Sequence, residues 1–392
     1  MNGLDFIEQA EPSAGYICSL SGQSFPLERP LWANPETGAH LMLPLGQGLD
    51  TDDIDQSERS LWRYGSALRV ARRDAISLGE GWTPISEVPW NGRRIHLKAE
   101  YFAPSGSFKD RGTAVMISYL RAHGITEVML DSSGNAGASV AAYAAAAGMS
   151  CRIFVPAATS SAKIAQIMAV GAEVVAIAGS RQDVADAALG EADTVFFASH
   201  NWQPFFLEGT KTLAYEIWEQ LGFRAPDAMV VPFGYGSNLL GPYLGFRELQ
   251  RRGMIAKIPK LFAVQAANCA PLHAAFEAGA EETRKFDPKP TMAEGIASSK
   301  PVRSREALAV IRATGGCTVA VTEDEIAAGL RALAERGFFV EPTSATIAPA
   351  IDKLIADGSL AADDTVVAVL TGTGLKASDK ISSILGTLDV PE

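Results

Sequence analysis

Cysteine is scarce in this sequence, and its few cysteines are not paired by spacing. None of the four belongs to a Cys-x-x-Cys motif, and they lie far apart at Cys18, Cys151, Cys269 and Cys317. This usage argues against a disulfide framework and is typical of a reducing compartment, where thiols serve as small core residues. We therefore expect a cytoplasmic protein.

Long apolar runs and an excess of positive charge are missing as well. The longest apolar-looking stretch, residues 140–149, is dominated by alanine and is too short for a membrane span. The N-terminus lacks the basic segment and apolar run of a signal peptide. The formal net charge is −11, and a negative field repels phosphate backbones and anionic lipids. We expect neither nucleic acid nor a membrane as a partner.

The chain has the length and composition of an ordinary globular protein. Its 392 residues, 47% apolar and 20% charged, predict two domains or one large α/β unit. Strands are predicted over 95–99, 127–130, 151–155, 173–177, 229–231, 261–264 and 365–370. Helices are predicted over 109–123, 136–147, 161–170, 210–221, 238–252 and 323–336, with a short amphipathic helix within 51–73. Because the strands do not alternate polar with apolar residues, we expect parallel sheets covered by helices.

Lys109 is predicted to lie in the first turn of a helix. Ser107 and Asp110 have the Ser-x-x-Asp spacing of a helix N-cap, which places Lys109 just inside the helix. The positive end of the helix dipole disfavours a cation there and favours the neutral amine, the form that condenses with an aldehyde. The alternative interpretation is a surface lysine that happens to fall near a cap.

A polar loop joins the predicted strand over 127–130 to an alanine-rich helix. It offers two hydroxyls, a flexible glycine and an amide, in Ser132, Ser133, Gly134 and Asn135. Ahead of a helix N-terminus, such a loop suits a carboxylate. An ordinary Ser/Asn cap on a core helix is the alternative.

Two glycine-containing loops follow later strands. The first consists of Gly234, Tyr235, Gly236, Ser237 and Asn238, whose backbone N–H groups can hold a phosphate without a charged side chain. It is neither a dinucleotide fingerprint nor a Walker loop, because Leu239 replaces the third glycine and proline follows Gly241. The second loop places the Thr371 hydroxyl at the end of the last strand. Ordinary turns are the alternative for both.

Taken together, the four segments fit a single ligand set. An aldehyde-reactive amine, a carboxylate site, an uncharged phosphate site and a strand-end hydroxyl match an amino acid joined to pyridoxal 5′-phosphate (PLP). We therefore predict a PLP enzyme that acts on an amino acid.

The chain resembles the tryptophan-synthase-β-like PLP enzymes (fold type II), and among them the threonine synthases. The resemblance runs from about residue 79 to residue 376. It is strongest in Gly106-Ser107-Phe108-Lys109-Asp110-Arg111-Gly112, Ser133-Gly134-Asn135, Leu207-Glu208-Gly209-Thr210-Lys211-Thr212, Glu341-Pro342-Thr343-Ser344-Ala345 and Thr371-Gly372-Thr373-Gly374-Leu375-Lys376.

This resemblance implies a fold, a site and an assembly. The fold is α/β, with two open twisted, mainly parallel sheets flanked by helices. Residues 51–111 and 201–392 would form a large PLP-binding domain, residues 112–200 a small α/β domain, and the protein would be a homodimer. Lys109 would form the Schiff base and move protons, Asn135 would bond the ring oxygen, Gly234 to Asn238 would hold the phosphate, and Thr371 would face the pyridine nitrogen. A neutral hydroxyl there should leave the ring less cationic than a carboxylate would.

Residues 1–50 are expected to form a degenerate zinc-ribbon-like segment. Residues 16–22 resemble the ribbon that opens many threonine synthases, but Ser21 stands at the second cysteine position and residues 32–38 lack the second pair. Because Cys18 alone cannot supply a tetrahedral site, we predict that no metal is bound.

Phe206 marks a departure from the family pattern. Threonine synthases typically have an arginine at this position, and it holds the substrate's phosphate; a phenyl ring lacks that bidentate fork. Residues 291–296 look closer to the corresponding segment of serine/threonine dehydratases. O-phosphohomoserine is therefore not the expected substrate, unless another cation such as Lys163 or Lys211 holds its phosphate.

Three functions remain open from the sequence. The first is a PLP-dependent lyase of the threonine synthase type, acting by β- or γ-elimination with or without replacement. The second is a serine/threonine ammonia-lyase, although no regulatory domain is expected after Lys376. The third is a non-catalytic PLP-binding regulator, which would not need the carboxylate site at Ser132 to Asn135.

Overall fold

The computed structural model of the chain describes residues 3–386, and at residues 161–163 and 181 it describes the backbone without the side chain. Two compact units are present. The first comprises the described residues up to Trp82, Ala103–Arg224 and Leu240–Lys257. The second comprises Thr83–Phe102, Ala225–Leu239 and the described residues from Ile258 onward. These boundaries differ from the predicted domain limits near residues 50, 111 and 200, and the predicted division stays a prediction.

The second unit is built on a six-stranded sheet in the order β12-β11-β10-β13-β5-β4. Its strands are β4 (Ile85–Trp90), β5 (Arg93–Ala99), β10 (Ala228–Pro232), β11 (Lys260–Ala266), β12 (Thr318–Val321) and β13 (Val366–Leu370). Neighbouring strands run parallel except β4 and β5, which form an antiparallel hairpin. Asn91 and Gly92 make its two-residue turn with φ of 47° and 76°, because this tight turn requires positive φ at both positions.

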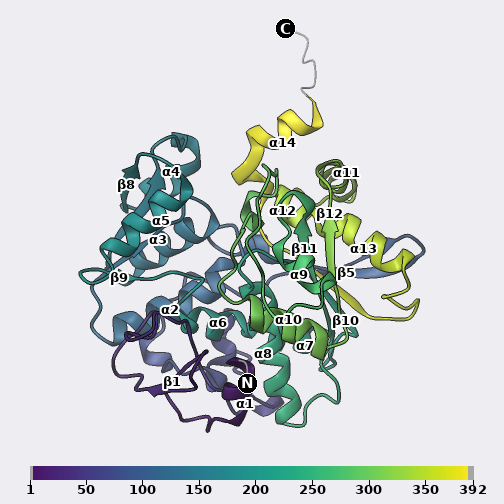
Figure 1. Cartoon of the computed structure of the whole chain (residues 1–392). Helices are drawn as coiled ribbons and strands as arrows, with labels where there is room; N and C mark the ends of the chain where they lie inside the picture. The colour runs from purple at the N-terminus through teal and green to yellow at the C-terminus, as the bar shows by residue number, and fades with distance from the viewer. Residues whose placement is uncertain (1–2, 387–392) are drawn as a thin grey trace. The chain divides into compact units, whose positions relative to one another are not determined.

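Helices cover the central strands of this sheet. Every residue of β10 and β13 is buried, as expected for parallel strands packed on both faces. Val230 and Ala368 share one core cluster with Leu330 on α11 (Glu323–Ala334) and Ile351 on α13 (Ile347–Ala356) (Figure 1). The unit contains α9 (Pro271–Glu277), α10 (Ser304–Ala313), α11 (Glu323–Ala334), α12 (Pro342–Ala345), α13 (Ile347–Ala356), α14 (Ser378–Leu385) and 3₁₀ helices at Glu100–Phe102, Ala267–Cys269, Glu294–Ile296 and Gly374–Ala377.

The first unit holds a four-stranded parallel sheet in the order β8-β7-β6-β9. Its strands are β6 (Glu127–Leu130), β7 (Ser150–Pro156), β8 (Glu173–Ile177) and β9 (Phe196–Phe197). Its helices are α2 (Lys109–Ala122), α3 (Asn135–Ala147), α4 (Ser161–Ala169), α5 (Arg181–Gly190), α6 (Pro204–Thr210), α7 (Thr212–Gln220) and, from Leu240 on, α8 (Ser237–Arg251). Gly124 and Gly148 follow α2 and α3 with φ of 80° and 67°, the left-handed conformation that favours glycine where a helix ends.

The N-terminal segment packs on the helices of the first unit. It contains α1 (Gly3–Gln9) and a small antiparallel sheet of β1 (Tyr16–Cys18), β2 (Ser24–Phe25) and β3 (Leu41–Met42), in the order β2-β1-β3. The Tyr16 hydroxyl donates a hydrogen bond to that of Tyr119 on α2 at 2.6 Å. The Tyr16 ring also meets the Phe205 ring of α6 edge-on, with centroids 6.1 Å apart. These contacts tie the segment to α2 and α6.

The amphipathic helix predicted within residues 51–73 is wrong. The chain there forms three 3₁₀ helices, at Thr51–Asp53, Leu61–Ala67 and Arg72–Asp74. The Asp50 side chain accepts a hydrogen bond from the Asp52 N–H, and the Ser60 side chain accepts one from the Trp62 N–H. Because each cap starts a new short turn, no continuous helix forms.

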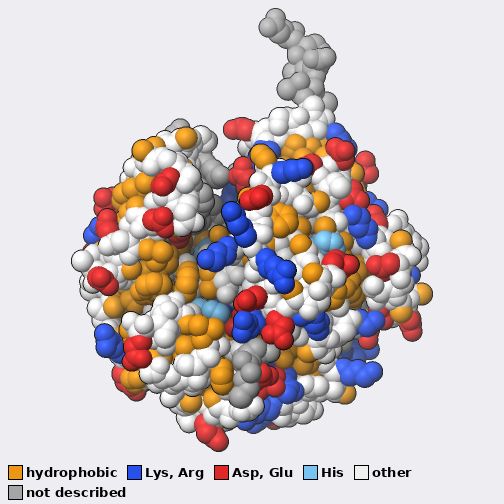
Figure 2. All heavy atoms as spheres, viewed as in Figure 1, with side chains coloured by type: hydrophobic (Ala, Val, Ile, Leu, Met, Phe, Trp, Pro, Cys, Tyr) orange, Lys and Arg blue, Asp and Glu red, His pale blue; other side chains and the backbone are white. Residues whose placement is uncertain are grey.

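The surface carries charges of both signs. Among the described residues, acidic and basic side chains are interspersed with apolar ones on the face drawn in Figure 2. Within residues 3–386, no helix is both long enough and apolar enough to cross a bilayer.

Candidate active site

Lys109 is the first residue of α2, so its predicted place in the first helical turn is confirmed. The predicted capping by Ser107 and Asp110 is wrong. The N-cap is Phe108, and the buried Ser107 hydroxyl has no hydrogen-bond partner among the described residues. The Asp110 carboxylate instead accepts hydrogen bonds from the Ser105 N–H at 2.6 Å and the Ser105 hydroxyl at 2.5 Å. The loop before α2 is therefore held by the carboxylate that follows Lys109.

Two aromatic rings flank the Lys109 amine. Its Nζ atom lies 4.6 Å from the centroid of the Phe108 ring and 5.6 Å from that of the Phe206 ring. Phe206 lies in α6 and is fully buried. A Cβ atom at Gly112 would lie 2.6 Å from the Phe206 ring, so glycine is needed where α2 passes α6. Two residues that the sequence proposed for the site, Lys109 and Phe206, thus lie side by side.

The loop from Ser132 to Asn135 ends at the start of α3, as predicted. The helix begins with Gly134 as an N-cap that makes no side-chain capping bond, so the alternative of an ordinary Ser/Asn cap is wrong. The Ser132 hydroxyl accepts a hydrogen bond from the Gly134 N–H at 3.3 Å. Such an N-terminus presents backbone N–H groups that can donate hydrogen bonds to an anion. Ser132, Ser133, Gly134 and Asn135 are all half-buried.

The starts of α2 and α3 are joined directly. The Ser139 hydroxyl, one turn into α3, donates a hydrogen bond to the Asp110 carboxylate at 2.6 Å and lies 2.8 Å from the Thr113 hydroxyl. Lys109 therefore begins one helix of the first unit, and the loop from Ser132 to Asn135 precedes a neighbouring helix to which it is bonded.

In the second unit, residues 234–238 follow β10 and lead into α8. Gly236 has φ of 99°, a conformation that favours glycine, and a Cβ at Gly234 would lie 3.1 Å from the Gly295 carbonyl oxygen. Asn238 is 4% exposed, and neither its amide oxygen nor its amide nitrogen has a hydrogen-bond partner among the described residues. Buried polar atoms normally have partners, so this amide fits a loop that closes on a polar ligand. The neighbouring Tyr235 is half-buried and Ser237 is buried.

Thr371 lies at the same edge of the sheet as that loop. It directly follows β13, which pairs in parallel with β10, so both connections leave from carboxyl ends of adjacent strands. Thr371 is 2% exposed. Its hydroxyl lies 2.9 Å from the Ser344 hydroxyl and donates a hydrogen bond to the Glu341 carboxylate at 3.1 Å. Glu341 and Ser344 belong to a motif that matches the family, but the sequence pattern predicted no role for either residue.

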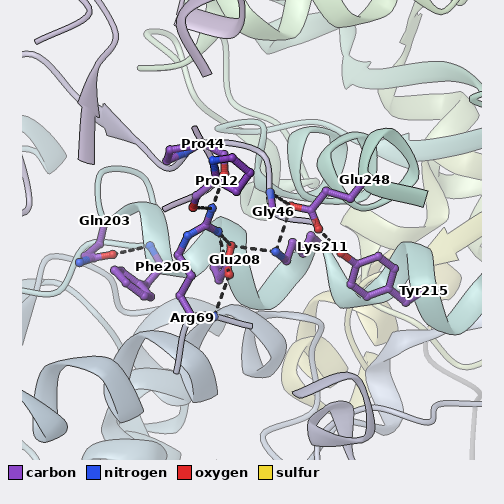
Figure 3. A network of polar contacts seen from close by, with 10 residues as sticks. All are labelled: Pro12, Pro44, Gly46, Arg69, Gln203, Phe205, Glu208, Lys211, Tyr215 and Glu248. Carbon is purple, nitrogen blue, oxygen red and sulfur yellow. Dashed lines mark hydrogen bonds and ion pairs between the residues drawn. The ribbon is translucent and has the colours of Figure 1, made fainter. Parts of the chain in front are cut away.

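The motif from Leu207 to Thr212 belongs to a buried ionic network (Figure 3). Lys211 is 1% exposed, and its Nζ atom lies 3.0 Å from the Glu208 carboxylate and 3.1 Å from the Glu248 carboxylate. Two carboxylates already hold this amine, which argues against Lys211 as a phosphate ligand. The side chain of Lys163 lies outside the described residues.

Arg69 extends this network to the N-terminal segment. Its guanidinium donates to the Glu208 carboxylate at 2.9 Å and to the Pro44 carbonyl at 2.7 Å (Figure 3). The Gly46 N–H donates to the Glu248 carboxylate at 2.6 Å. The motif therefore fixes the N-terminal segment against α6 and α8, a role that its local spacing did not reveal.

In the N-terminal segment, hydrogen bonds surround the Cys18 thiol. Burial opposes ionisation of the Cys18 thiol, but hydrogen bonds to Ser21 and Asn34 hold its pKa below the ordinary value. The Asn34 side chain in turn accepts a hydrogen bond from the Thr37 N–H at 3.2 Å. Among the described residues, no three His, Cys, Asp or Glu side chains gather in an arrangement that could hold a metal ion.

We expect the purified protein to contain no stoichiometric zinc. With Cys18 hydrogen-bonded to Ser21 and Asn34, a chelator should leave the melting temperature unchanged, because no metal contributes to folding. Elemental analysis and thermal unfolding with and without chelator measure this. One zinc per chain, or a lower melting temperature with chelator, would contradict the prediction.

The first unit has a lysine at the start of a helix, and the second unit has an uncharged glycine loop beside a strand-end hydroxyl. Together these features define a class of enzymes that hold a phosphorylated aldehyde cofactor. The chain belongs to the pyridoxal-phosphate dependent enzyme family, whose model matches residues 76–372.

Curated relatives and solved structures agree with this assignment. The chain is 34% identical to the threonine synthase of Methanocaldococcus jannaschii over 337 residues, which cover 84% of this chain and 83% of that protein. It is 34% identical to the threonine synthase of Mycobacterium tuberculosis over 328 residues, which cover 79% of this chain and 88% of that protein. Its fold is similar to the processed form of threonine deaminase isoform 2 from Solanum lycopersicum, with a TM-score of 0.67 and 22% identity over 87% of this chain and 96% of that one. Its fold is also similar to that of a fungal L-serine ammonia-lyase from Rhizomucor miehei, with a TM-score of 0.67 and 23% identity. That match covers 77% of this chain and 97% of the other.

The residues present fit PLP. The loop over residues 234–238 is uncharged and buried except at Tyr235, and its Asn238 amide has no hydrogen-bond partner among the described residues. Lys109 supplies a primary amine at the start of α2. The predicted fold class is confirmed as α/β with parallel and mixed sheets flanked by helices. The zinc-ribbon ancestry of the N-terminal segment stays a prediction.

Proposed function

We propose that this chain is a PLP-dependent lyase of the threonine synthase type, acting on a small amino acid by β- or γ-elimination with or without replacement. The observation that carries the proposal is Lys109 at the start of α2, in a chain that shares 34% identity with threonine synthases. When bound, PLP supplies an electron sink for charge that develops at the substrate's α-carbon.

Each site residue has a role in this proposal. Lys109 holds the cofactor covalently and moves protons at its amine. Asn135 bonds the ring oxygen, and Thr371 faces the ring nitrogen. The phosphate lies on Gly234, Tyr235, Gly236, Ser237 and Asn238, and the substrate carboxylate lies on Ser132, Ser133 and Gly134. Gly134 supports the last assignment because it starts α3 without a side-chain cap.

The assembly and location are part of the same proposal. We place residues 51–111 and 201–392 in a PLP-binding domain and residues 112–200 in a small domain. We expect a cytoplasmic homodimer, which sedimentation and cell fractionation can test. The free thiols of Cys18, Cys151, Cys269 and Cys317 support a reducing compartment.

The substrate is proposed to have an uncharged distal end. The Phe206 ring is fully buried and lies 5.6 Å from the Lys109 amine, where the family pattern has an arginine. The His200 ring meets Phe206 edge-on, with centroids 5.6 Å apart. An apolar ring in this place favours a neutral hydroxy or substituted amino acid over a phosphorylated one.

We expect O-phosphohomoserine to be a poor substrate. Loss of a charge-assisted pair to a buried phosphate should weaken binding by about 2–5 kcal/mol. The measurement is the ratio of kcat/KM for O-phosphohomoserine to that for serine or threonine. Phe206→Arg should raise that ratio, and Phe206→Leu, which changes shape without adding charge, should not. A high ratio in the unmodified enzyme would refute the argument from Phe206.

A serine/threonine ammonia-lyase is the second candidate. Phe206 favours it, because that reaction needs no cation for a distal phosphate. The same substrate panel separates the two candidates, since an ammonia-lyase releases ammonia from serine or threonine and makes no threonine.

A further inference from the structure

Gln203 starts the short helix that carries Phe206. It is the N-cap of α6 and is fully buried, and its side-chain oxygen accepts a hydrogen bond from the Phe205 N–H at 2.5 Å (Figure 3). Its main-chain oxygen accepts another from the Phe206 N–H at 3.2 Å. Because Pro204 occupies the first helical position and has no N–H, Gln203 satisfies the first two N–H groups that α6 presents.

The N-terminal segment holds the other end of the Gln203 side chain. The Gln203 amide nitrogen donates to the Leu31 carbonyl oxygen at 3.5 Å, and the Leu31 N–H donates to the Tyr16 hydroxyl at 3.4 Å. Both hydrogen bonds are long, and two ring contacts add to them. The Phe205 ring meets Tyr16 edge-on with centroids 6.1 Å apart, and it stacks on Tyr119 with centroids 3.6 Å apart. The N-terminal segment thus fixes the start of α6.

A shift at the start of α6 would reach the Phe206 ring directly, because α6 and α2 touch through glycines. A Cβ atom at Gly112 would lie 2.6 Å from the Phe206 ring, and one at Gly209 would lie 2.1 Å from the Arg111 carbonyl oxygen. No side chain fills the space between the helices at these two points. Since the Phe206 centroid lies 5.6 Å from the Lys109 Nζ atom, a displaced ring changes the space beside that amine.

We propose that Gln203 is a positioning residue that fixes the Phe206 ring beside the Lys109 amine and so sets the fit of the substrate's distal end. The inference rests on the proposed function, in which the Phe206 ring lies against that end of the substrate. Glutamine is not among the favoured N-cap residues, so no local pattern predicts this role. The role depends on Leu31, which lies 172 residues earlier in the chain.

The position of the ring is measured by ¹⁹F NMR of the resting holoenzyme with 4-fluorophenylalanine at position 206 alone. Because the Phe206 ring is fully buried, the otherwise unmodified protein should give one narrow signal. Gln203→Met keeps the length of the side chain but removes the capping oxygen, so the signal should shift and broaden. Gln203→Asn supplies a favoured cap and should restore most of the original signal. Ser180→Ala, which removes the N-cap of α5 in the same unit, should leave the signal unchanged.

Steady-state kinetics give a second measurement, with serine or threonine as the substrate, whichever the unmodified enzyme turns over faster. Gln203→Met should raise KM about 3–10-fold, the range for loss of one aromatic contact, because the ring no longer fits the distal end. It should leave kcat within about twofold of the original value, because Lys109 and the cofactor are untouched. A general loss of structure would instead lower kcat.

Two results would overturn the inference. One is a broad or split ¹⁹F signal in the otherwise unmodified holoenzyme, which decides the matter even if Gln203→Met does not fold. The other is the same signal and the same KM in Gln203→Met as in the unmodified protein. Failure of the proposed function gives a different result: a shifted signal with no change of KM in Gln203→Met or in Phe206→Leu. That result would confirm the positioning of the ring and overturn the substrate role of Phe206.

Discussion

Lys109→Ala should lower kcat at least about 10³-fold while the protein still binds PLP. The substitution removes the covalent attachment and the proton-transferring amine together, and either function alone contributes several orders of magnitude. PLP should remain bound because the loop over residues 234–238 does not involve Lys109. Single-turnover kinetics, with the bound cofactor measured by absorbance, give both quantities.

A small added amine provides the control for Lys109→Ala. Ethylamine should restore part of the lost rate in this variant and should not accelerate the unmodified enzyme, because it replaces the missing proton carrier. Activity within tenfold of the unmodified enzyme, or complete loss of PLP, would contradict the role assigned to Lys109.

Lys211→Met should lower the free energy of unfolding by about 3–5 kcal/mol at pH 7, the range for breaking a buried ion pair from one side. The variant leaves the Glu208 and Glu248 carboxylates buried without the amine that lies 3.0 and 3.1 Å from them. Tyr215 donates to Glu248 as well, but a neutral hydroxyl cannot balance its charge. Urea unfolding of PLP-saturated protein measures the loss.

The pH dependence of this loss follows from Glu208. Burial raises the pKa of its carboxyl group, but Arg69 and Lys211 outweigh burial and hold it below the ordinary value. A depressed pKa stabilises the fold above the unfolded-state pKa, and that contribution disappears as the pH falls through the folded-state value. The difference between Lys211→Met and the unmodified protein should therefore be largest at neutral pH and shrink in acid.

Lys353 offers a matched control for Lys211. It forms an ion pair with Glu325 at 2.8 Å, but the two side chains are 39% and 34% exposed. Lys353→Met should cost less than about 1 kcal/mol, because solvent screens such a pair. Equal losses for the two lysines, or a loss for Lys211→Met that does not depend on pH, would contradict the account of the buried network.

Local patterns predicted most of the parallel strands. The limits of β6 and β8 agree with the prediction, because continuous apolar runs and glycine stops define these elements along the chain. Of the β4–β5 hairpin, the sequence predicted β5 and missed β4. β4 lies at the sheet edge, alternates exposed with buried residues and contains Pro89, so it lacks the continuous apolar run of a central strand.

Long-range partners explain what the sequence missed near the site. Ser107 and Asp110 have capping spacing, but Asp110 is engaged by Ser105 and by Ser139, which lies 29 residues further on. Glu341 reaches Thr371 across 30 residues. No local pattern encodes such contacts, whereas Lys109 was identifiable because its helix position and its motif lie within a few residues.

The most direct test of the account is the location of the cofactor's covalent bond. Freshly purified holoenzyme is reduced with borohydride, digested and mapped by mass spectrometry, with the other lysines of the chain as internal controls. The account predicts one reduced PLP per chain on the peptide containing Lys109. Label on any other lysine, or the absence of any reducible cofactor, would contradict it.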